Sequence, residues 1–308
     1  MQQPQPRKNG WIPDCRVGLT VARSRSVVPL ATEPSRRIIV RNIAPTFTAL
    51  LLAFLVHVPV AYAQVPNTVF LDELTWMEVA DKIDAGTTTI IVATAGTEQN
   101  GPHMVLGKHK FIITETAERI AREVGNALVA PIVTYVPEGN IEGITGNRQR
   151  SGTITLPNEH YMKLLEYTAR SLAGGGFTDI VLIGDSGGNQ QGMETVAEML
   201  NEEWSGSPTR VHFVGDYYSG HGFREWLQEQ GHTMEDIGSH AGITDTSQLL
   251  YVNAKHIRTE KLEPFGGFEG AGVRGDPTQA SVSYGRVGIQ LKVDAAVRQI
   301  QELMSGRR

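Results

Sequence analysis

The segment from Gly96 to His109 holds one carboxylate and two imidazoles within twelve residues, at Glu98, His103 and His109. Carboxylate and imidazole groups can ligate a divalent transition metal without any thiolate. Taken singly, each of these side chains is equally consistent with an ordinary surface or hydrogen-bonded residue. The segment therefore indicates a metal site only if other parts of the chain supply further ligands.

A second chemical signal is the sequence GDSGG at residues 184–188, which contains Ser186. It matches the pentapeptide around the nucleophile of chymotrypsin-like proteases, but that fold is all-β and this segment follows a strand in an α/β alternation. It also satisfies G-x-S-x-G, the nucleophile elbow of α/β hydrolases, with Asp245 and His256 following in the required chain order. The remaining interpretation is a glycine-rich turn capped by Asp185 or Ser186.

The elements that position these segments are apolar runs alternating with helical patterns. Such alternation predicts βαβ units, and hence an α/β domain with a mainly parallel sheet and helices on both faces. In open sheets of this kind ligands bind beyond the carboxyl ends of the strands, so chemistry is expected at residues 96–109, 184–190 and 240–247. The expected strands are 87–95, 127–136, 179–183 and 211–214, and the expected helices are 75–85, 111–124, 158–173, 195–204, 222–230 and 293–304.

Three motifs together resemble the creatininase (creatinine amidohydrolase) family over most of residues 70–255. The family shows G-x-x-E-Q-H-G-P-H-L-P-L followed by Asp, a strand ending in G-H-G-G-N, and H-A-G-x-x-E-T-S. This chain has GTEQNGPHMVL, GDSGGN and HAGITDTS in the same order. The resemblance implies a three-layer α/β/α fold, one or two divalent ions, most commonly zinc or manganese, and hydrolysis of a C–N bond in a small cyclic or linear amide. It also implies a homo-oligomer, with hexamers frequent in the family.

Several ligand positions of the family differ in this chain. Glu98 matches a metal-binding Glu of the family. Asn100, however, stands in place of a ligand His, and His109 stands in place of a bridging Asp. Ser186 stands at the histidine of G-H-G-G-N, and Asp245 replaces a Glu. Because the residue before the serine adds a carboxylate, we interpret these changes as altered coordination. The candidate metal ligands are Glu98, His109, Asp185 and Asp245.

The resemblance implies that the metal lowers the pKa of a bound water toward ~7 and polarises the scissile carbonyl. His240 is the candidate for proton transfer to the leaving nitrogen, with His103 as the alternative, because an imidazole titrates in the useful range. Two other functions stay open, a metal-independent serine hydrolase using Ser186 and a non-catalytic protein that binds a small ligand.

The substrate side is expected in residues 137–157, where the family usually has a His and a Phe-Pro pair. Asn147, Arg150 and Ser151 stand there instead, and Arg148 or Arg150 could bind a carboxylate by two hydrogen bonds or simply be solvated. His221 follows another strand and is a further candidate. The proposed substrate-binding residues are Asn100, Arg150, Ser186 and His221.

Composition narrows the classes of partner. The chain has 308 residues with 40% hydrophobic and 20% charged content, which is ordinary for a globular protein. From residue 64 onward it carries 20 basic and 31 acidic residues, a net charge of −11 that argues against nucleic acid and against anionic lipid. The only cysteine is Cys15, so residues 64–308 have no disulfide and no thiolate ligand. A small amide molecule is therefore the expected partner.

Residues 1–63 have the pattern of a targeting segment. An apolar stretch from Ile43 to Ala63 follows several arginines and ends in Ala-Tyr-Ala, the order of a cleaved secretory signal. The run SRRIIVR at 35–41 also resembles a twin-arginine export signal. We expect a periplasmic or secreted domain of residues 64–308 with no stable membrane association, although an uncleaved single-span anchor stays open. Residues 1–34, aperiodic and either disordered or an over-extended start, are left out of the fold prediction.

Overall fold

Apolar runs form a four-stranded, all-parallel sheet with the strand order β2-β1-β3-β4. The central strands β1 (Thr89–Thr94) and β3 (Asp179–Gly184) are buried at every residue, as expected for β-branched and aliphatic runs covered on both faces. The edge strands are β2 (Ala127–Val129) and β4 (Arg210–Phe213). This computed structural model describes residues 66–143, 149–262 and 270–306.

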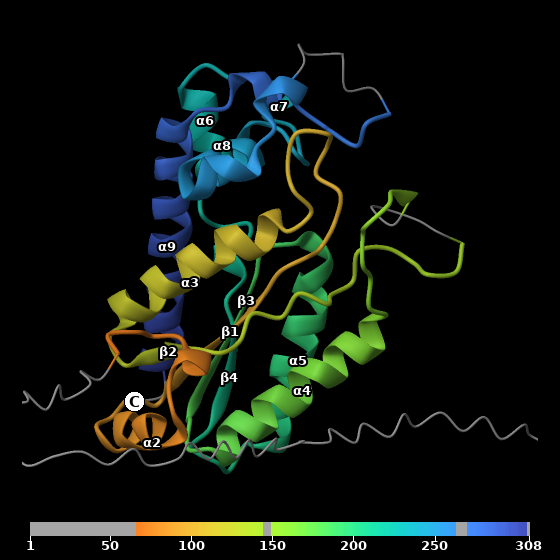
Figure 1. Ribbon diagram of the computed structural model, residues 1–308. Helices are drawn as coiled ribbons and strands as arrows, with labels where there is room; N and C mark the ends of the chain where they lie inside the picture. The colour runs from red at the N-terminus through yellow and green to blue at the C-terminus, as the bar shows by residue number, and fades with distance from the viewer. Residues whose placement is uncertain (1–65, 144–148, 263–269, 307–308) are drawn as a thin grey trace, which may run out of the picture. The chain divides into compact units, whose positions relative to one another are not determined.

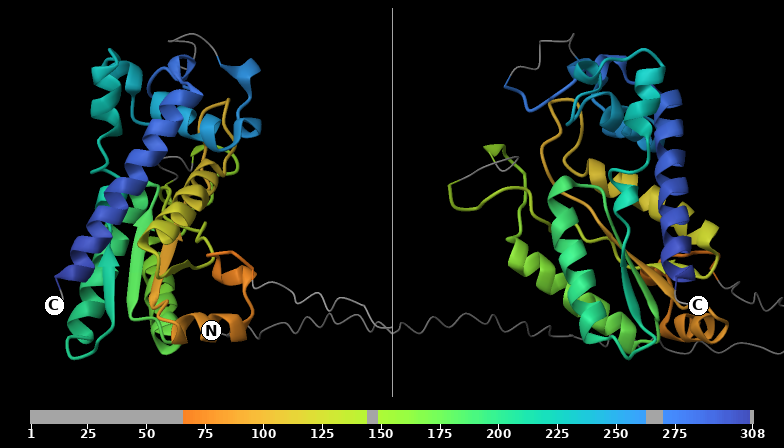
Figure 2. Two further views of the ribbon diagram at one scale, coloured as in Figure 1. Left: turned by 90° about the vertical axis from the view of Figure 1, so that its left-hand side faces the viewer. Right: turned by 180° about the vertical axis from the view of Figure 1, so that it is seen from behind.

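Helices cover both faces of the sheet (Figures 1 and 2). The helices α3 and α9 lie on one face and α4 and α5 on the other. Along β1, Ile91 and Ala93 pack in the core with α3 and α9, whereas Ile90 and Val92 pack in the core with α4 and α5. The described residues thus form one three-layer α/β/α unit, and the predicted fold class is confirmed.

A cap of short helices lies beyond the carboxyl ends of the strands, at the top of Figure 1. The cap has its own apolar clusters, and α8 packs closely against the upper part of α9. The helices are α2 (Trp76–Asp84), α3 (Lys108–Val124), α4 (Asn158–Gly174), α5 (Gln190–Glu203), α6 (Phe223–Glu229), α7 (Met234–Ile237), α8 (Ile243–Asn253) and α9 (Val282–Ser305). Short 3-10 helices lie at Leu71–Glu73, Gly187–Asn189, Gly215–Tyr217, Ala254–His256, Thr259–Lys261 and Pro277–Gln279.

Several elements near the strand ends differ from the sequence prediction. Strand β2 ends at Val129 instead of residue 136, and helix α5 begins at Gln190 instead of residue 195. Helix α3 begins at Lys108 instead of residue 111, so His109 lies in its first turn and not in a loop. The segment expected as a loop at 240–247 enters α8 at Ile243. Helix α9 begins at Val282, well before the predicted start at 293. The changes at α3 and α8 place the candidates His109 and Asp245 on helices, which hold a side chain more firmly than a loop does.

The targeting segment at 1–63 and its boundary with residue 64 lie outside the described residues. Among the residues that the structure does describe, no helix combines the length and the apolar character needed to cross a bilayer.

Candidate active site

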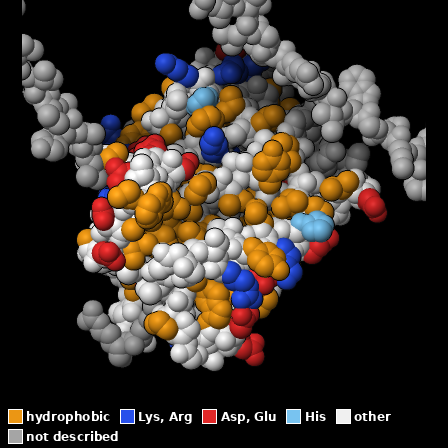
Figure 3. All heavy atoms as spheres, turned by 60° about the horizontal axis from the view of Figure 1, so that its bottom comes forward, with side chains coloured by type: hydrophobic (Ala, Val, Ile, Leu, Met, Phe, Trp, Pro, Cys, Tyr) orange, Lys and Arg blue, Asp and Glu red, His pale blue; other side chains and the backbone are white. Residues whose placement is uncertain are grey.

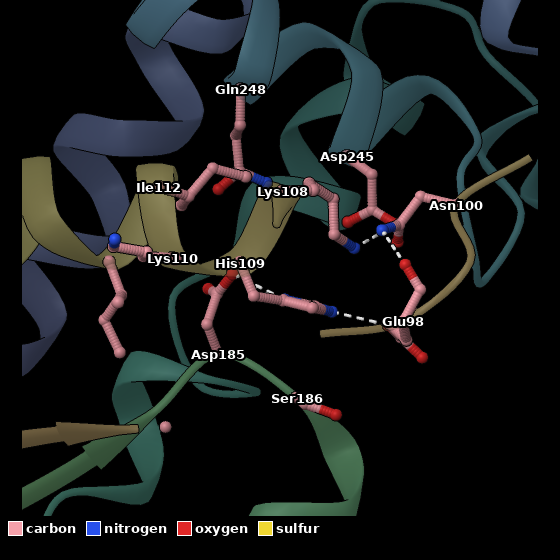
Figure 4. A network of polar contacts seen from close by, with 12 residues as sticks. Glu98, Asn100, Lys108, His109, Lys110, Ile112, Asp185, Ser186, Asp245 and Gln248 are labelled. Atoms are coloured by element: carbon pink, nitrogen blue, oxygen red, sulfur yellow. Dashed lines mark hydrogen bonds and ion pairs between the residues drawn. The ribbon is translucent and has the colours of Figure 1, made fainter. Parts of the chain in front are cut away.

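The register of the sheet brings two polar strand ends side by side. β1 and β3 pair in parallel up to Thr94 and Gly184. The segment after β1 therefore leaves the sheet beside Asp185, which follows β3, and then returns into α3 with His109 in its first turn. Glu98, His109 and Asp185 thereby meet at one edge of the sheet, as Figure 4 shows.

His109 links the two carboxylates through its two ring nitrogens. Its Nε2 lies 2.6 Å from Glu98 Oε1 and its Nδ1 lies 2.8 Å from Asp185 Oδ2. Burial by itself would lower the pKa of His109, and the Lys108 charge acts in the same direction, but hydrogen bonds to Asp185 and Glu98 raise this pKa to about 9. His109 is therefore an imidazolium at neutral pH and donates to both carboxylates.

Asp185 has two further partners. Lys292 of α9 donates from Nζ to Asp185 Oδ1, and the Tyr217 hydroxyl donates to the same oxygen at 3.2 Å. Burial would raise the pKa of Asp185, but the Lys292 charge and the His109 hydrogen bond hold it well below its usual range. Asp185 thus stays ionised although its side chain is buried.

Asp245 lies in the first turn of α8, where a negative charge is favourable beside the helix N-terminus. Its Oδ2 accepts from Lys108 Nζ at 3.1 Å and from the Ala241 backbone N–H at 2.8 Å. Ala241 turns the chain into this position with φ 55°, a left-handed conformation that is unusual for a residue other than glycine. Burial would raise the pKa of Asp245, but the Lys108 charge holds it below its usual range.

A second glutamate, Glu138, completes the group and was not among the predicted site residues. Its carboxyl is buried and lies beside Glu98 and Ser186. Burial and the adjacent Glu98 charge raise the pKa of Glu138. Burial acts in the same sense on Glu98, but the His109 hydrogen bond and charge outweigh it and lower the pKa of Glu98. The surroundings therefore favour the ionised form of Glu98 and the protonated form of Glu138.

His240, one of the two predicted proton-transfer residues, lies close to Glu98. Its Nε2 lies 2.9 Å from the Gln99 carbonyl oxygen, which makes Nε2 the donor, and its Nδ1 lies 3.9 Å from Glu98 Oε1. Burial lowers the pKa of His240, so the ring is neutral with its lone pair on Nδ1. His103 instead has Nε2 3.0 Å from the Thr246 hydroxyl, and burial lowers its pKa to about 4.

The predicted substrate-binding residues are dispersed. Asn100 is fully buried, and its Nδ2 donates to the Glu98 carbonyl oxygen at 2.9 Å. Ser186 is buried beside Glu138. His221 lines a cavity of about 220 Å³ together with Asp185, Asp245 and Lys292, and burial lowers its pKa to about 4.

Arg150 is half-buried and donates to the Gly270 carbonyl oxygen, so the structure does not bring it into the buried group. Asn147 and Arg148 lie outside the described residues. The expected recognition of a substrate carboxylate by these arginines stays a prediction.

The serine-nucleophile hypothesis finds no support in this arrangement. Ser186 has ordinary extended backbone, φ −118° and ψ 146°, instead of the strained turn of a nucleophile elbow. The neighbouring imidazole, His109, already has a carboxylate on each nitrogen. His256 stacks on Phe111 with 3.8 Å between ring centroids, and Asp245 pairs with Lys108. No base positioned by a third group is thus available to Ser186 among these residues.

The side chains as placed do not fit a metal ion. True ligands surround one centre, with donor atoms roughly 3 to 4 Å apart for bonds of about 2.0 to 2.2 Å. Glu98 and Asp185 instead lie on opposite sides of the His109 ring (Figure 4), because the two imidazole nitrogens point away from one another. Within the described ranges no three His, Cys, Asp or Glu side chains form a group that could hold a metal.

The fold defines a three-layer α/β/α protein, and comparison with known proteins gives the family. Residues 72–300 match the family described as "Creatininase: Creatinine amidohydrolase". The match covers well over half of the chain, so the protein belongs to the creatininase family, and the predicted resemblance is confirmed.

Characterised relatives are distant. The "Mycofactocin precursor peptide peptidase" of Mycolicibacterium smegmatis is 28% identical over 178 residues, 56% of this chain and 61% of that protein. The protein of the same name from Mycobacterium tuberculosis is 28% identical over 243 residues, 70% of this chain and 86% of that one. The "Creatinine amidohydrolase" of Pseudomonas putida is 29% identical over 117 residues, 38% of this chain and 44% of that one.

Solved structures share the fold. The structure named "Creatininase Mn" superposes with a TM-score of 0.66 at 21% identity, covering 76% of this chain and 98% of the other. A mutant creatininase described as "Zn-Zn type" gives 0.62 at 22% identity, covering 77% and 98%. The names of these two structures mention manganese and zinc, whereas the described side chains of this chain form no metal-binding group.

Sequence reasoning missed three residues of the site, Glu138, Lys108 and Lys292. Lys292 carried a usable signal, because it shares the apolar stripe of Ile289, Val293 and Ala296 at helical spacing. A lysine on a buried stripe needs a negative partner. Lys108 and Glu138 carried no such signal, since each is flanked by glycine or proline-containing loop sequence.

Proposed function

We propose that this protein hydrolyses an amide C–N bond in a small cyclic or linear amide, with its reaction centre at Glu98, Glu138 and His240. The observation that carries the proposal is the burial of two neighbouring carboxyl groups, Glu98 and Glu138, whose pKa values are moved in opposite directions by their surroundings. Two titratable groups whose pKa values are moved apart can serve as base and acid in one hydrolytic site.

The described residues supply the proton transfers of an amide hydrolysis. Neutral His240 Nδ1 and Glu98 Oε1 are 3.9 Å apart, close enough for one water molecule to contact both. His240 takes a proton from this water as its oxygen bonds to the amide carbon, and Glu138 gives its proton to the nitrogen as the C–N bond breaks. Transfer of the proton from His240 to Glu138 restores the starting state.

The size of the cavity beside Asp185 favours a small substrate. This cavity is bordered by Asp185, His221 and Lys292 and measures about 220 Å³. Pockets for drug-sized ligands are larger, roughly 300–1,000 Å³. The names of the mycobacterial relatives make a peptide the competing substrate, so peptides belong in the substrate test.

A metal-dependent form of the same hydrolysis is the second candidate, supported by the manganese and zinc names of the structural neighbours. Zinc and manganese would be the ions to test. Glu98, Asp185 and Asp245 would then have to exchange His109, Lys292 and Lys108 for an ion, because each carboxylate is bonded to one of these cations.

The proposal is tested by a product assay on the purified protein. Creatinine, other small cyclic amides, linear amides and short peptides serve as substrates, and the released amine or opened ring is measured. Glu138→Gln should lower kcat by about 10²- to 10⁴-fold, because it removes the proton donor while keeping the shape of the side chain. Glu142→Gln, at an exposed glutamate of the same segment, is the matched control and should keep the wild-type rate. Full activity in Glu138→Gln would reject the proposed acid.

We also propose self-association, as predicted from the resemblance. Figure 3 looks onto the end of the molecule where α2 lies, and apolar side chains are exposed there. In α2 itself, Trp76 is 80% and Met77 60% exposed. Exposed apolar groups of this size on one face are typical of protein contacts. Sedimentation of the purified protein gives the subunit number, and a monomer at all concentrations would contradict this part.

A further inference from the structure

Each carboxylate of the candidate site is bonded to a cation from the chain itself. Lys292 and His109 bond to Asp185, His109 also bonds to Glu98, and Lys108 bonds to Asp245. Each of these carboxylates thus already has a nitrogen of a basic side chain within hydrogen-bond distance.

These cations are built into the interior. The side chains of Lys108, His109 and Lys292 are 1%, 6% and 7% exposed. A buried ammonium or imidazolium is costly unless it is paired and hydrogen-bonded. A solvated surface lysine needs no ion pair. These three buried side chains do, and the carboxylates of the site supply it.

The positions of Lys108 and His109 in α3 are a further reason why these cations need negative partners. Lys108 and His109 occupy the first turn of α3, whose N-terminus carries partial positive charge. Positive side chains are unfavourable at that end of a helix unless negative groups face them. Here Asp245, Glu98 and Asp185 do so, within 2.6 to 3.1 Å.

We propose that Lys108, His109 and Lys292 occupy the place of a divalent metal, so that this site binds none. A divalent ion would have to displace these side chains, which are anchored in α3 and α9, before it could reach the carboxylates. The same chain has Asn100 and Ser186 where the family has ligand histidines, which removes donors as the cations are added. This inference concerns metal content and does not depend on the proposed hydrolysis.

The experiment uses the full chain purified from its native export route without chelators. Metal content is measured by plasma mass spectrometry, and Zn²⁺ and Mn²⁺ are titrated into the protein by calorimetry. The proposal predicts substoichiometric metal, no saturable binding of either ion, and a Tm unchanged by EDTA. One or more zinc or manganese ions per chain, with a Tm lowered by EDTA, would overturn it.

A variant of Lys292 tests whether the basic side chains are what prevents metal binding. Lys292→Met keeps the length of the side chain but removes one positive charge from Asp185. It should lower Tm, and added Zn²⁺ or Mn²⁺ should restore part of the loss, because an ion that binds only the folded state stabilises it. Lys255→Met, at an exposed lysine, is the matched control and should show neither effect. A folded Lys292→Met protein with no response to either ion would count against the proposal, and the wild-type metal content decides the matter if the variant does not fold.

Discussion

His109 holds Glu98 and Asp185 as an imidazolium, which determines how stability should depend on pH. Its pKa rises from 6.5 to about 9 on folding. A raised pKa means that the folded state binds more protons, so this contribution is complete below pH 6.5 and is lost as pH rises through about 9. The shift corresponds to a loss on the order of 3 kcal/mol in the free energy of unfolding over that range.

Urea unfolding between pH 6 and 9.5 measures this loss. His109→Gln should be less stable than wild type at pH 6 and should show a flatter profile, since glutamine does not titrate. His160→Gln, at an exposed histidine, should follow the wild-type profile. A wild-type free energy that stays constant or rises between pH 6.5 and 9 would show that His109 is not held as a cation.

At the scale of elements, two glycines allow α9 to lie against the cap. A Cβ at Gly285 would come 1.9 Å from the Ser247 carbonyl oxygen of α8, and one at Gly288 would come 2.4 Å from the Phe223 ring of α6. Without these close approaches α9 could not carry Lys292 to Asp185. The same glycines hid the helix from sequence analysis, because glycine in a helical pattern indicates a break.

Gly285→Ala should therefore lower the free energy of unfolding by about 1–3 kcal/mol, the usual cost of overpacking. The change in helix propensity acts in the opposite direction, by up to ~1 kcal/mol. Gly174→Ala in the last turn of α4, where no atom lies within 4 Å of the added Cβ, is the control and should be neutral or slightly stabilising. Thermal or urea unfolding compares the two variants, and equal stabilities would mean that α8 and α9 are not in close contact.

The strands were predictable from sequence for a clear physical reason. The runs at 89–94 and 179–184 are buried on both faces, and continuous β-branched and aliphatic residues are the signature of that environment. Helix α8 was not predictable, because Thr244, Thr246 and Ser247 favour caps and turns over helix interiors. Its helical state depends on packing against α9, which only the folded chain provides.

The candidate site was likewise predictable from sequence only in part. The strand-end rule placed Glu98, His109 and Asp185 correctly at one edge of the sheet. The partners of these residues come from distant positions, as with Lys292 and Asp185, which are 107 residues apart. Pairing over that distance leaves no local pattern, so sequence showed possible ligands without the cations that bond to them.

For the whole molecule, the targeting pattern leads to a prediction about processing. If the segment ending in Ala63 is a cleaved export signal, the exported protein begins at Gln64. N-terminal sequencing of the protein recovered from the periplasm or the medium checks this. An N-terminus upstream of residue 61 in the exported form, or retention of the full chain in the membrane fraction, would contradict it.

The central claim is that a member of the creatininase family hydrolyses an amide with its own acid and base side chains. The most direct measurement is the rate of amide hydrolysis by protein dialysed against EDTA, on the best substrate of the panel. Chelated wild type should keep its full rate, because the proposed proton transfers use side chains alone. Loss of the rate on chelation, with recovery on adding Zn²⁺ or Mn²⁺, would contradict hydrolysis by side chains alone and establish the metal-dependent reaction in its place.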